Sequence, residues 1–204
     1  MARKDRISHR QQRAREKRRL ILVMVEGETE ECYFTKLKKK TKVLGITVEC
    51  ACAEHSTPDS VIKCAQKAKT PFGVAYDERW VVYDTDVLST DELNQTLSQA
   101  GKGSLQCAIS NPCFEYWLLL HHEYCTPSFN SSDHCIRRLQ ERDATYRKGK
   151  SNAMESYLEE SKVRTAVAHA ERVMQSHRFA RNDEPHPHPS TTVHLLVKKL
   201  LSQV

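Results

Sequence analysis

The sequence predicts an α/β protein built on a doubly wound, mostly parallel β-sheet with helices on its faces. Two short apolar runs, Leu20–Val25 and Trp80–Tyr83, carry no charge, which is typical of strands that are buried on both faces. Segments with helical spacing of apolar residues alternate with such runs, and this alternation favours β-α-β units with right-handed crossovers. A chain of 204 residues is long enough for one such domain with some additional helices.

The first half of the chain contains the elements of this sheet. Thr57 and Ser89 are typical of helix starts, while Gly45 and Gly103 are typical of the points where helices end. We expect strands at about 20–26, 46–53, 80–83 and 105–109. We expect the intervening helices at about 29–40, 57–68 and 89–103.

Beyond Asn111 the pattern changes to helices. Pro112 is expected at the first position of a helix that ends near His121. Ser190 is expected to cap the last helix, after an irregular stretch rich in proline at 181–189. Further helices are expected at about 136–143, 151–159, 161–178 and 191–202, with a loop at 126–135 and a basic loop at 146–150.

These features divide the chain into a basic amino-terminal arm at 1–19, an α/β core at 20–125 and a helical extension at 126–204 that packs on the core. The arm holds nine Arg and Lys residues against Asp5 and Glu16, whereas the rest of the chain has 23 basic and 24 acidic residues. Such an arm attracts phosphate backbones without reading sequence. A solvated tail, a protein-interaction arm and a packed helix remain alternatives.

The composition disfavours several classes of protein. No segment approaches the roughly 20 apolar residues of a membrane span, and the basic terminus is not followed by a signal-type apolar segment, so we expect a cytoplasmic protein without membrane contact. The eight cysteines lack a Cys-x-x-Cys spacing, so we expect buried free thiols. A zinc protein using cysteines with His121, His122, His186 and His188 is disfavoured because no standard ligand pair is present.

Acidic residues directly follow two of the predicted strands. Glu26 closes the first apolar run, and Asp84 and Asp86 close the run at 80–83. Because the carboxyl ends of parallel strands form one ligand crevice, these acids can converge there, and carboxylates that face each other favour Mg²⁺ or Mn²⁺. Glu115, expected in the first turn of a helix after the fourth strand, is a third source of ligands or a general base. Turn residues, helix caps and dipole stabilisation are the alternatives.

Four segments resemble motifs of the RloB family, whose fold is similar to the Toprim domain of topoisomerases, primases and OLD nucleases. Residues 25–34 (VEGETEECYF) resemble its amino-terminal acidic motif, 83–86 (YDTD) its Asp-x-Asp, and 110–121 (SNPCFEYWLLLH) its most distinctive signature. Residues 189–194 (PSTTVH) resemble its closing motif, with His188 where Asn is expected. The resemblance covers nearly the whole chain beyond the arm, and it implies a Toprim-like core with a mostly parallel four-stranded sheet.

The resemblance also implies a Mg²⁺-dependent centre, or one using Mn²⁺, that acts on phosphodiester bonds. By position, Asp84 and Asp86 would hold the metal, Glu26 would bind it or act as a general acid or base, and Glu30 and Glu115 are further candidates. The expected substrate is RNA, such as tRNA, or DNA. The resemblance further implies anti-phage or abortive-infection loci and an ATPase partner of the AAA or ABC type.

Carboxylates alone cannot neutralise the charge that develops on a phosphate during cleavage, so a basic side chain should also approach, with Lys150 and His194 as the candidates. A catalytically inactive module that binds nucleic acid or an ATPase is the alternative function. The sequence leaves open the choice between RNA and DNA and the oligomeric state, including a homodimer. Contacts to nucleic acid are expected from Arg13, Arg15, Lys17, Arg18, Arg147, Lys148, Lys150 and His194.

Overall fold

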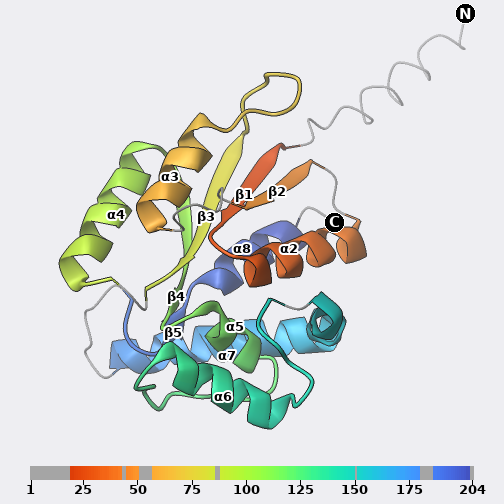
Figure 1. Cartoon of the computed structure of the whole chain (residues 1–204), viewed down its shortest axis with the longest axis vertical. Helices are drawn as coiled ribbons and strands as arrows, with labels where there is room; N and C mark the ends of the chain where they lie inside the picture. The colour runs from red at the N-terminus through yellow and green to blue at the C-terminus, as the bar shows by residue number, and fades with distance from the viewer. Residues whose placement is uncertain are drawn as a thin grey trace, which may run out of the picture.

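The computed structural model describes residues 19–42, 45–50, 57–85, 88–149, 151–179 and 186–202. The strands are β1 (Ile21–Val25), β2 (Ile46–Cys50), β3 (Glu78–Asp84), β4 (Gln106–Asn111) and β5 (Ser190–Thr191). They form one sheet in the order β2-β1-β3-β4-β5 (Figure 1). The first four strands run parallel, and β5 pairs antiparallel with β4. The predicted α/β class with a mostly parallel sheet is confirmed, and the two-residue β5 adds to the four predicted strands.

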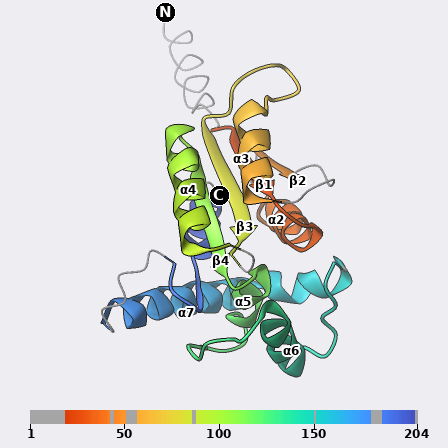
Figure 2. The ribbon, with the colours of Figure 1, turned by 60° about the vertical axis from the view of Figure 1, so that its left-hand side comes forward.

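Helices cover both faces of this sheet and one of its ends. They are α2 (Glu28–Thr41), α3 (Pro58–Lys67), α4 (Thr90–Lys102), α5 (Phe114–Leu119), α6 (Ser132–Arg142), the 3₁₀ helix η1 (Ser151–Leu158), α7 (Glu160–Phe179) and α8 (Val193–Leu201). α3 and α4 lie on one face, and α2 and α8 on the other (Figure 1). α5, α6 and α7 gather at one end of the sheet (Figure 2). Among the described helices, none combines the length and the hydrophobicity that a membrane crossing requires.

The side chains of β1 supply both halves of the core. Leu22 and Met24 pack in the cluster that contains α3 and α4, whereas Ile21, Val23 and Val25 pack in the larger cluster that contains α2, α5, α7 and α8. All five side chains are buried, which explains why this run contains no charge.

The path of the chain into β1 is fixed at the edge of the sheet where the parallel strands begin. The backbone N–H of Leu20 donates to Asp77 Oδ2 at 2.8 Å. Arg19 and Lys199 both pair with Glu78 Oε1 at 2.8 Å. Although burial works against it, the two cations lower the pKa of Glu78. Arg19, the last residue of the predicted basic arm, is therefore held at this edge, and the rest of the arm lies outside the described residues.

Two of the predicted helix starts are confirmed by their caps. The hydroxyls of Thr57 and Ser89 each accept the backbone N–H of the residue three positions later. The side chains at those positions, Ser60 and Glu92, bond back to the cap residue. Both α3 and α4 therefore begin with a capping box, which satisfies two backbone donors at each helix start.

The pairing of β4 with β5 changes the predicted roles of two residues. Asn111 pairs with Ser190 and therefore belongs to the sheet. α5 begins at Phe114, two residues after Pro112, and not at the proline as predicted. For the same reason Ser190 lies in a strand and does not cap a helix. α8 begins after Thr192, whose hydroxyl accepts the backbone N–H of Ile109 at 2.8 Å and is therefore used in the sheet.

The helix predicted at 29–40 is confirmed as α2, whose bounds differ from the prediction by one residue at each end. Two other helix predictions differ from the structure. α6 begins four residues earlier than predicted, because the Ser131 hydroxyl accepts the backbone N–H of His134 and caps the helix there. The segment predicted as an α-helix at 151–159 is the 3₁₀ helix η1, a form that is common in connections.

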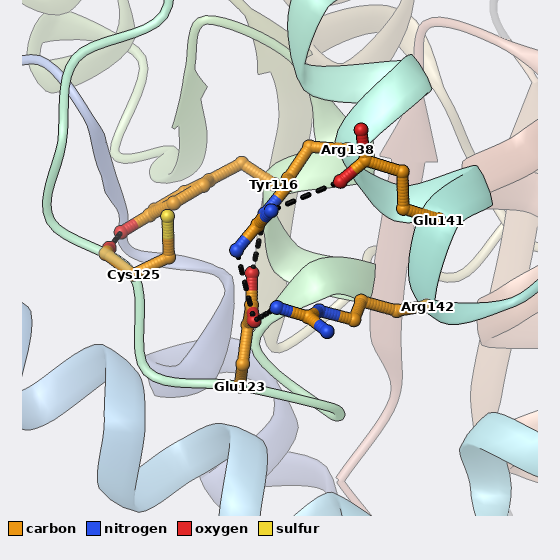
Figure 3. A network of polar contacts seen from close by, with 6 residues as sticks. All are labelled: Tyr116, Glu123, Cys125, Arg138, Glu141 and Arg142. Atoms are coloured by element: carbon orange, nitrogen blue, oxygen red, sulfur yellow. Dashed lines mark hydrogen bonds and ion pairs between the residues drawn. The ribbon is translucent and has the colours of Figure 1, made fainter.

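Ion pairs hold the carboxyl end of α6 against the segment that follows α5 (Figure 3). Arg138 Nε donates to Glu123 Oε1 at 2.8 Å, and Arg142 pairs with the other oxygen of the same carboxylate. Beside them, the Tyr116 hydroxyl donates to the carbonyl of Cys125 at 2.6 Å. The partly buried Glu123 thus pairs with two arginines that lie one helical turn apart. These pairs hold the last turn of α6 in place.

Candidate functional site

Acidic side chains from four separate elements line a pocket of about 450 Å³ at the carboxyl ends of the strands. Glu26 follows β1, Asp84 ends β3, Glu30 lies in the first turn of α2, and Glu115 lies in the first turn of α5. Lys148, from the connection between α6 and η1, is the one cation among the described lining residues. The remaining lining residues are Gly27, Glu28, Thr29 and Gly149.

The register of two neighbouring strands brings Glu26 and Asp84 together. Val25 pairs with Val82 in the ladder between β1 and β3, so the residue after β1 lies beside the end of β3. The backbone N–H of Glu26 donates to the carbonyl of Val82 at 3.1 Å. The backbone N–H of Asp84 donates to Glu26 Oε2 at 3.3 Å. The two predicted strand-end acids therefore meet at the expected edge of the sheet.

Glu30 reaches the same pocket because Gly27 leaves room for its carboxylate. A Cβ added at Gly27 would lie 2.9 Å from Glu30 Oε2, which is closer than real Cβ contacts allow. The φ angle of Gly27 is −133°, an extended conformation that any residue adopts. The site therefore requires glycine for its small size and not for its backbone freedom. The Glu30 side chain is buried, and it faces the interior rather than capping the helix from outside.

Glu115 is brought to the pocket by a helix that is otherwise apolar. Its neighbours Phe114, Tyr116 and Trp117 are buried in the core cluster, and Glu115 itself is 1% exposed. The Tyr146 hydroxyl donates to Glu115 Oε1 at 2.8 Å. A buried carboxylate is thus stabilised by a specific donor, as burial of a charged group requires.

Burial and mutual repulsion make two of these carboxylates difficult to ionise. Burial raises the pKa of Glu30 to about 7, and the negative charges of Glu115 and Glu26 contribute in the same direction. Burial also raises the pKa of Asp84 well above its usual range, and repulsion from Glu30, Glu115 and Glu26 adds to this effect. A carboxyl group in these surroundings is stabilised by a proton or by a nearby cation.

Asp84 also has an oxygen atom without a partner. Its Oδ1 is shielded from solvent and accepts no hydrogen bond from the described residues, whereas the backbone N–H of Phe114 bonds to the carboxylate and lowers its pKa slightly against the other effects. An unsatisfied buried acceptor costs roughly 1–3 kcal/mol. A cation bound beside this oxygen would supply the partner that it lacks among the described residues.

Lys148 partly balances the negative charge at the rim of the pocket. Its side chain is exposed. Partial burial by itself would lower the pKa of Lys148, but attraction to Glu115, Asp84 and Glu30 outweighs this effect and raises it. One ammonium group cannot balance the charge of several carboxylates. The pocket would therefore also attract a further cation.

The donor chemistry of the pocket fits a hard divalent cation such as Mg²⁺ or Mn²⁺, which prefers oxygen ligands. A cation would relieve the repulsion between Glu30 and Asp84 and would give Asp84 Oδ1 a partner. Within the part of the chain that the structure describes, no group of three or more His, Cys, Asp and Glu side chains is placed so that it could hold a metal ion. Asp86 lies outside the described residues. The fit therefore rests on the type of donors and on the unpartnered oxygen.

Comparison with known families gives one match, which covers most of the chain. A family model described as RloB-like protein matches residues 21–200. The chain belongs to the RloB-like family. The match includes every residue of the acidic pocket. Searches of curated proteins and of solved structures found no match.

Of the nucleic-acid contacts predicted for this RloB-like protein, Arg147, Lys148 and His194 lie in the described part of the chain. Arg147 is exposed, and its guanidinium donates to the carbonyls of Ala144 at 2.8 Å and Tyr146 at 2.7 Å, so it also supports the local turn. Lys148 is the predicted contact that the structure places beside the acids. The predicted residues that lie outside the described part of the chain are Arg13, Arg15, Lys17, Arg18, Asp86 and Lys150.

His194 lies in the core and does not line the acidic pocket. The side chain lies on α8 with 5% of its surface exposed, and Nδ1 lies 3.1 Å from the carbonyl of Thr191. Burial lowers the pKa of His194, which disfavours the charged ring that a contact with phosphate would use. The contact of His194 with nucleic acid stays a prediction.

The contacts of the histidines give no support to a zinc site in this RloB-like protein. His121 lies 3.3 Å from the Tyr33 hydroxyl and 3.0 Å from the Trp117 carbonyl, and burial lowers its pKa to about 3. His188 Nδ1 lies 2.7 Å from Asn111 Oδ1. The cysteines whose side chains are described are free thiols, as predicted.

Three residues around the pocket were missed by sequence reasoning: Thr29, Tyr146 and Gly149. Thr29 lies between two acids in the first turn of α2, where its small polar side chain gives no separate signal. Tyr146 and Gly149 lie in the segment that was predicted as a basic loop, and its lysines and arginine were the residues singled out. Only the contact across 31 positions between Tyr146 and Glu115 shows their role.

Proposed function

We propose that this RloB-like protein is a divalent-metal-dependent nuclease that hydrolyses phosphodiester bonds in RNA or DNA. The observation that carries the proposal is the meeting of four predicted carboxylates in one pocket, with Lys148 at its rim. Each acid comes from a different element, and two of them have raised pKa values because they are buried together. Turn or cap functions involve local contacts, and they do not account for this convergence.

The acidic residues have two roles in this proposal. Glu26, Glu30 and Asp84 would hold Mg²⁺ or Mn²⁺ together with Asp86, and the bound ion would lower the pKa of water and offset charge on the phosphate. Glu115 accepts a hydrogen bond through Oε1 from Tyr146. Fixed in this way at the pocket, Glu115 is the residue that would take a proton from the attacking water.

Lys148 is the basic residue that would contact the substrate phosphate. It is exposed at the rim and lies close enough to the carboxylates for their charge to raise its pKa, so it stays protonated at pH 7 and offers donors to an anionic oxygen. Arg147, Lys150 and the basic arm would hold the rest of the strand through contacts that carry no sequence information.

The proposal includes a biological setting, which is supported by the RloB motifs at 25–34, 83–86 and 110–121. The nuclease would be the Toprim-type effector of an anti-phage or abortive-infection system, with an ATPase of the AAA or ABC type as its partner. Co-purification with the neighbouring ATPase, and cleavage assays with and without it, test this setting separately from the chemistry.

The central experiment is a cleavage assay with tRNA, messenger RNA, single-stranded DNA and duplex DNA, in Mg²⁺, in Mn²⁺ and in EDTA. We expect cleavage that requires the metal and that falls by about 100-fold or more in Glu26→Gln and Asp84→Asn. Glu92→Gln is the matched control, because Glu92 is an exposed acid on α4 whose cap contacts a glutamine preserves. Unchanged cleavage by folded pocket variants would reject the assignment.

A second candidate is a module that binds nucleic acid or the ATPase without catalysis. It is favoured by the finding that no metal-binding group is already assembled among the described residues. A shift of the unfolding temperature by Mn²⁺ that is lost in Asp84→Asn supports the enzyme. Nucleic-acid binding that is unaffected by EDTA, without cleavage of any substrate, supports the binding module.

A further inference from the structure

Residues 143–149, here called the strap, run from the end of α6 past the acidic pocket to η1. The strap contributes Lys148 and Gly149 to the lining of the pocket. Its first turn is closed by Asp143, whose Oδ1 accepts the backbone N–H of Thr145 at 2.9 Å. Gly149 has a φ of +73°, a conformation that glycine adopts without steric cost. The strap therefore has a defined path beside the acids.

Hydrogen bonds connect the strap to both helices that carry pocket acids. The backbone N–H of Gly149 donates to the Thr29 hydroxyl at 3.4 Å. The Tyr146 hydroxyl donates to Glu115 Oε1 at 2.8 Å. Thr29 belongs to α2 and Glu115 to α5, so the strap is held to both helices.

The chemistry of the two partners fixes the direction of each bond. The carboxylate of Glu115 can only accept, so the single O–H of Tyr146 donates to it. The N–H of Gly149 can only donate, so the Thr29 hydroxyl accepts from it. One bond therefore holds the strap to α5 and the other holds it to α2.

The surroundings of Tyr146 keep this donor in place. The side chain is fully buried, and burial together with the charge of Glu115 raises the pKa of the Tyr146 hydroxyl above its ordinary value. The hydroxyl is therefore protonated at pH 7 and donates to Glu115 Oε1.

We propose that Tyr146 is a positioning residue of the acidic pocket, which orients the Glu115 carboxylate and fastens the strap that carries Lys148. The inference rests on the proposed metal-dependent function, because it assigns Tyr146 a role in preparing the pocket for a cation and a phosphate. Tyr146 itself contacts neither ligand. It acts through Glu115, while Gly149 of the same strap is held by Thr29.

The chain offers a matched control in Tyr157. The Tyr157 hydroxyl is also a donor to a carboxylate, Asp143 Oδ2, at 2.7 Å, and the side chain is likewise fully buried. Asp143 begins the strap but does not line the acidic pocket. Tyr146→Phe and Tyr157→Phe therefore each remove one buried hydroxyl and one bond that holds the strap, and they differ in whether the carboxylate that accepts the bond belongs to the pocket.

The experiment measures the affinity of the purified protein for Mn²⁺ by calorimetry, together with the urea midpoint of unfolding. We expect Tyr146→Phe to weaken Mn²⁺ binding by about tenfold, because it releases the Glu115 carboxylate, whose negative charge adds to that of the proposed ligands, from its place beside the ion. We expect Tyr157→Phe to leave the affinity within about twofold. We expect both variants to lose similar stability, since each loses one buried hydrogen bond. Thr29→Val, which removes the acceptor of the Gly149 N–H, should give an intermediate loss of affinity.

The possible outcomes separate the inference from the proposed function. If the wild-type protein binds no Mn²⁺, the metal-dependent function is rejected, and the inference with it. If the wild-type protein binds Mn²⁺ and Tyr146→Phe binds it equally well, the inference alone is overturned. Equal loss of affinity in Tyr146→Phe and Tyr157→Phe would show a general structural effect and would also overturn it. Should Tyr146→Phe fail to fold, the comparison of Thr29→Val with Tyr157→Phe decides the question.

Discussion

The backbone N–H of Asp84 donates to Glu26 Oε2 at 3.3 Å, across the neighbouring strands β3 and β1. The side chain of one pocket acid thus fixes the backbone that carries another. Because this contact needs only an acceptor oxygen at position 26, the structural role of Glu26 can be separated from the role of its charge.

Glu26→Gln keeps an acceptor oxygen and removes the charge, whereas Glu26→Ala removes both. We expect both variants to lose Mn²⁺ binding, but only Glu26→Ala to lose stability, by about 1 kcal/mol for the missing hydrogen bond. Urea unfolding in EDTA measures the difference. Equal stability of the two variants would show that the contact with Asp84 contributes nothing to the fold.

The pH dependence of stability should report the buried Glu30. Its pKa is raised from 4.5 to about 7 in the folded protein. Between these values the folded chain retains a proton that the unfolded chain releases, so the free energy of unfolding falls as the pH rises from about 4.5 to 7. At a pH above this range, the ionisation of Glu30 lowers the free energy of unfolding by about 3 kcal/mol. Glu30→Gln should remove the part of this dependence that Glu30 contributes and leave the part due to Asp84, whose pKa is also raised by burial.

Thermal unfolding in EDTA between pH 5 and 8 tests this expectation, with Glu28→Gln as the control, because Glu28 is an exposed acid on the same helix. Mn²⁺ should restore stability to the wild-type protein at pH 8 and have little effect on Glu30→Gln. A wild-type stability that rises between pH 5 and 7 would contradict the burial of Glu30 as an ionisable group.

Gly27→Ala should damage the pocket without damaging the fold. The new Cβ would lie 2.9 Å from Glu30 Oε2, so the carboxylate must move, while the extended backbone at position 27 accepts alanine. We expect Mn²⁺ affinity to fall by about tenfold with little loss of stability. Gly101→Ala, which meets no atom within 4 Å, should instead leave affinity unchanged and stabilise α4 by roughly 0.5–1 kcal/mol.

Lys148→Ala should weaken the contact with phosphate and change its salt dependence. If Lys148 contacts one phosphate, the slope of log affinity against log salt for a nucleic-acid strand should become shallower by about 1. Binding measured at several salt concentrations, with Ca²⁺ in place of Mg²⁺ to slow cleavage, tests this. Lys102→Ala, an exposed lysine that lines a different pocket, should leave the slope unchanged. The same slope for Lys148→Ala and the wild-type protein would remove Lys148 from the interface.

The sequence was sufficient to predict the strands and the acids at their ends, because these depend on local composition. A run such as Leu20–Val25 excludes charge when both faces are buried, so the first acid after it lies at the edge of the sheet. The meeting of Glu26 with Asp84 follows from parallel pairing alone. Glu30 and Glu115 were named from the family resemblance and from their place in a first helical turn.

The features that were not predicted depend on contacts between distant parts of the chain. Serine is a common helix-capping residue, yet the pairing of Ser190 with Asn111 places it in a strand. His194 was given a role from its place near the end of a motif, and only the packing of α8 on the sheet shows that it is buried. Tyr146 contacts Glu115 across 31 residues, a relation that local periodicity does not encode.

The ion pairs of Glu78 with Arg19 and Lys199 have a geometric consequence for any long ligand. They hold Arg19 at the opposite end of β1 from Glu26, which lies seven positions and about 23 Å away at about 3.3 Å per extended residue. A polymer that touched both Arg19 and the pocket would cover a length similar to about seven base pairs. Short oligonucleotides would therefore engage only one of these two places at a time.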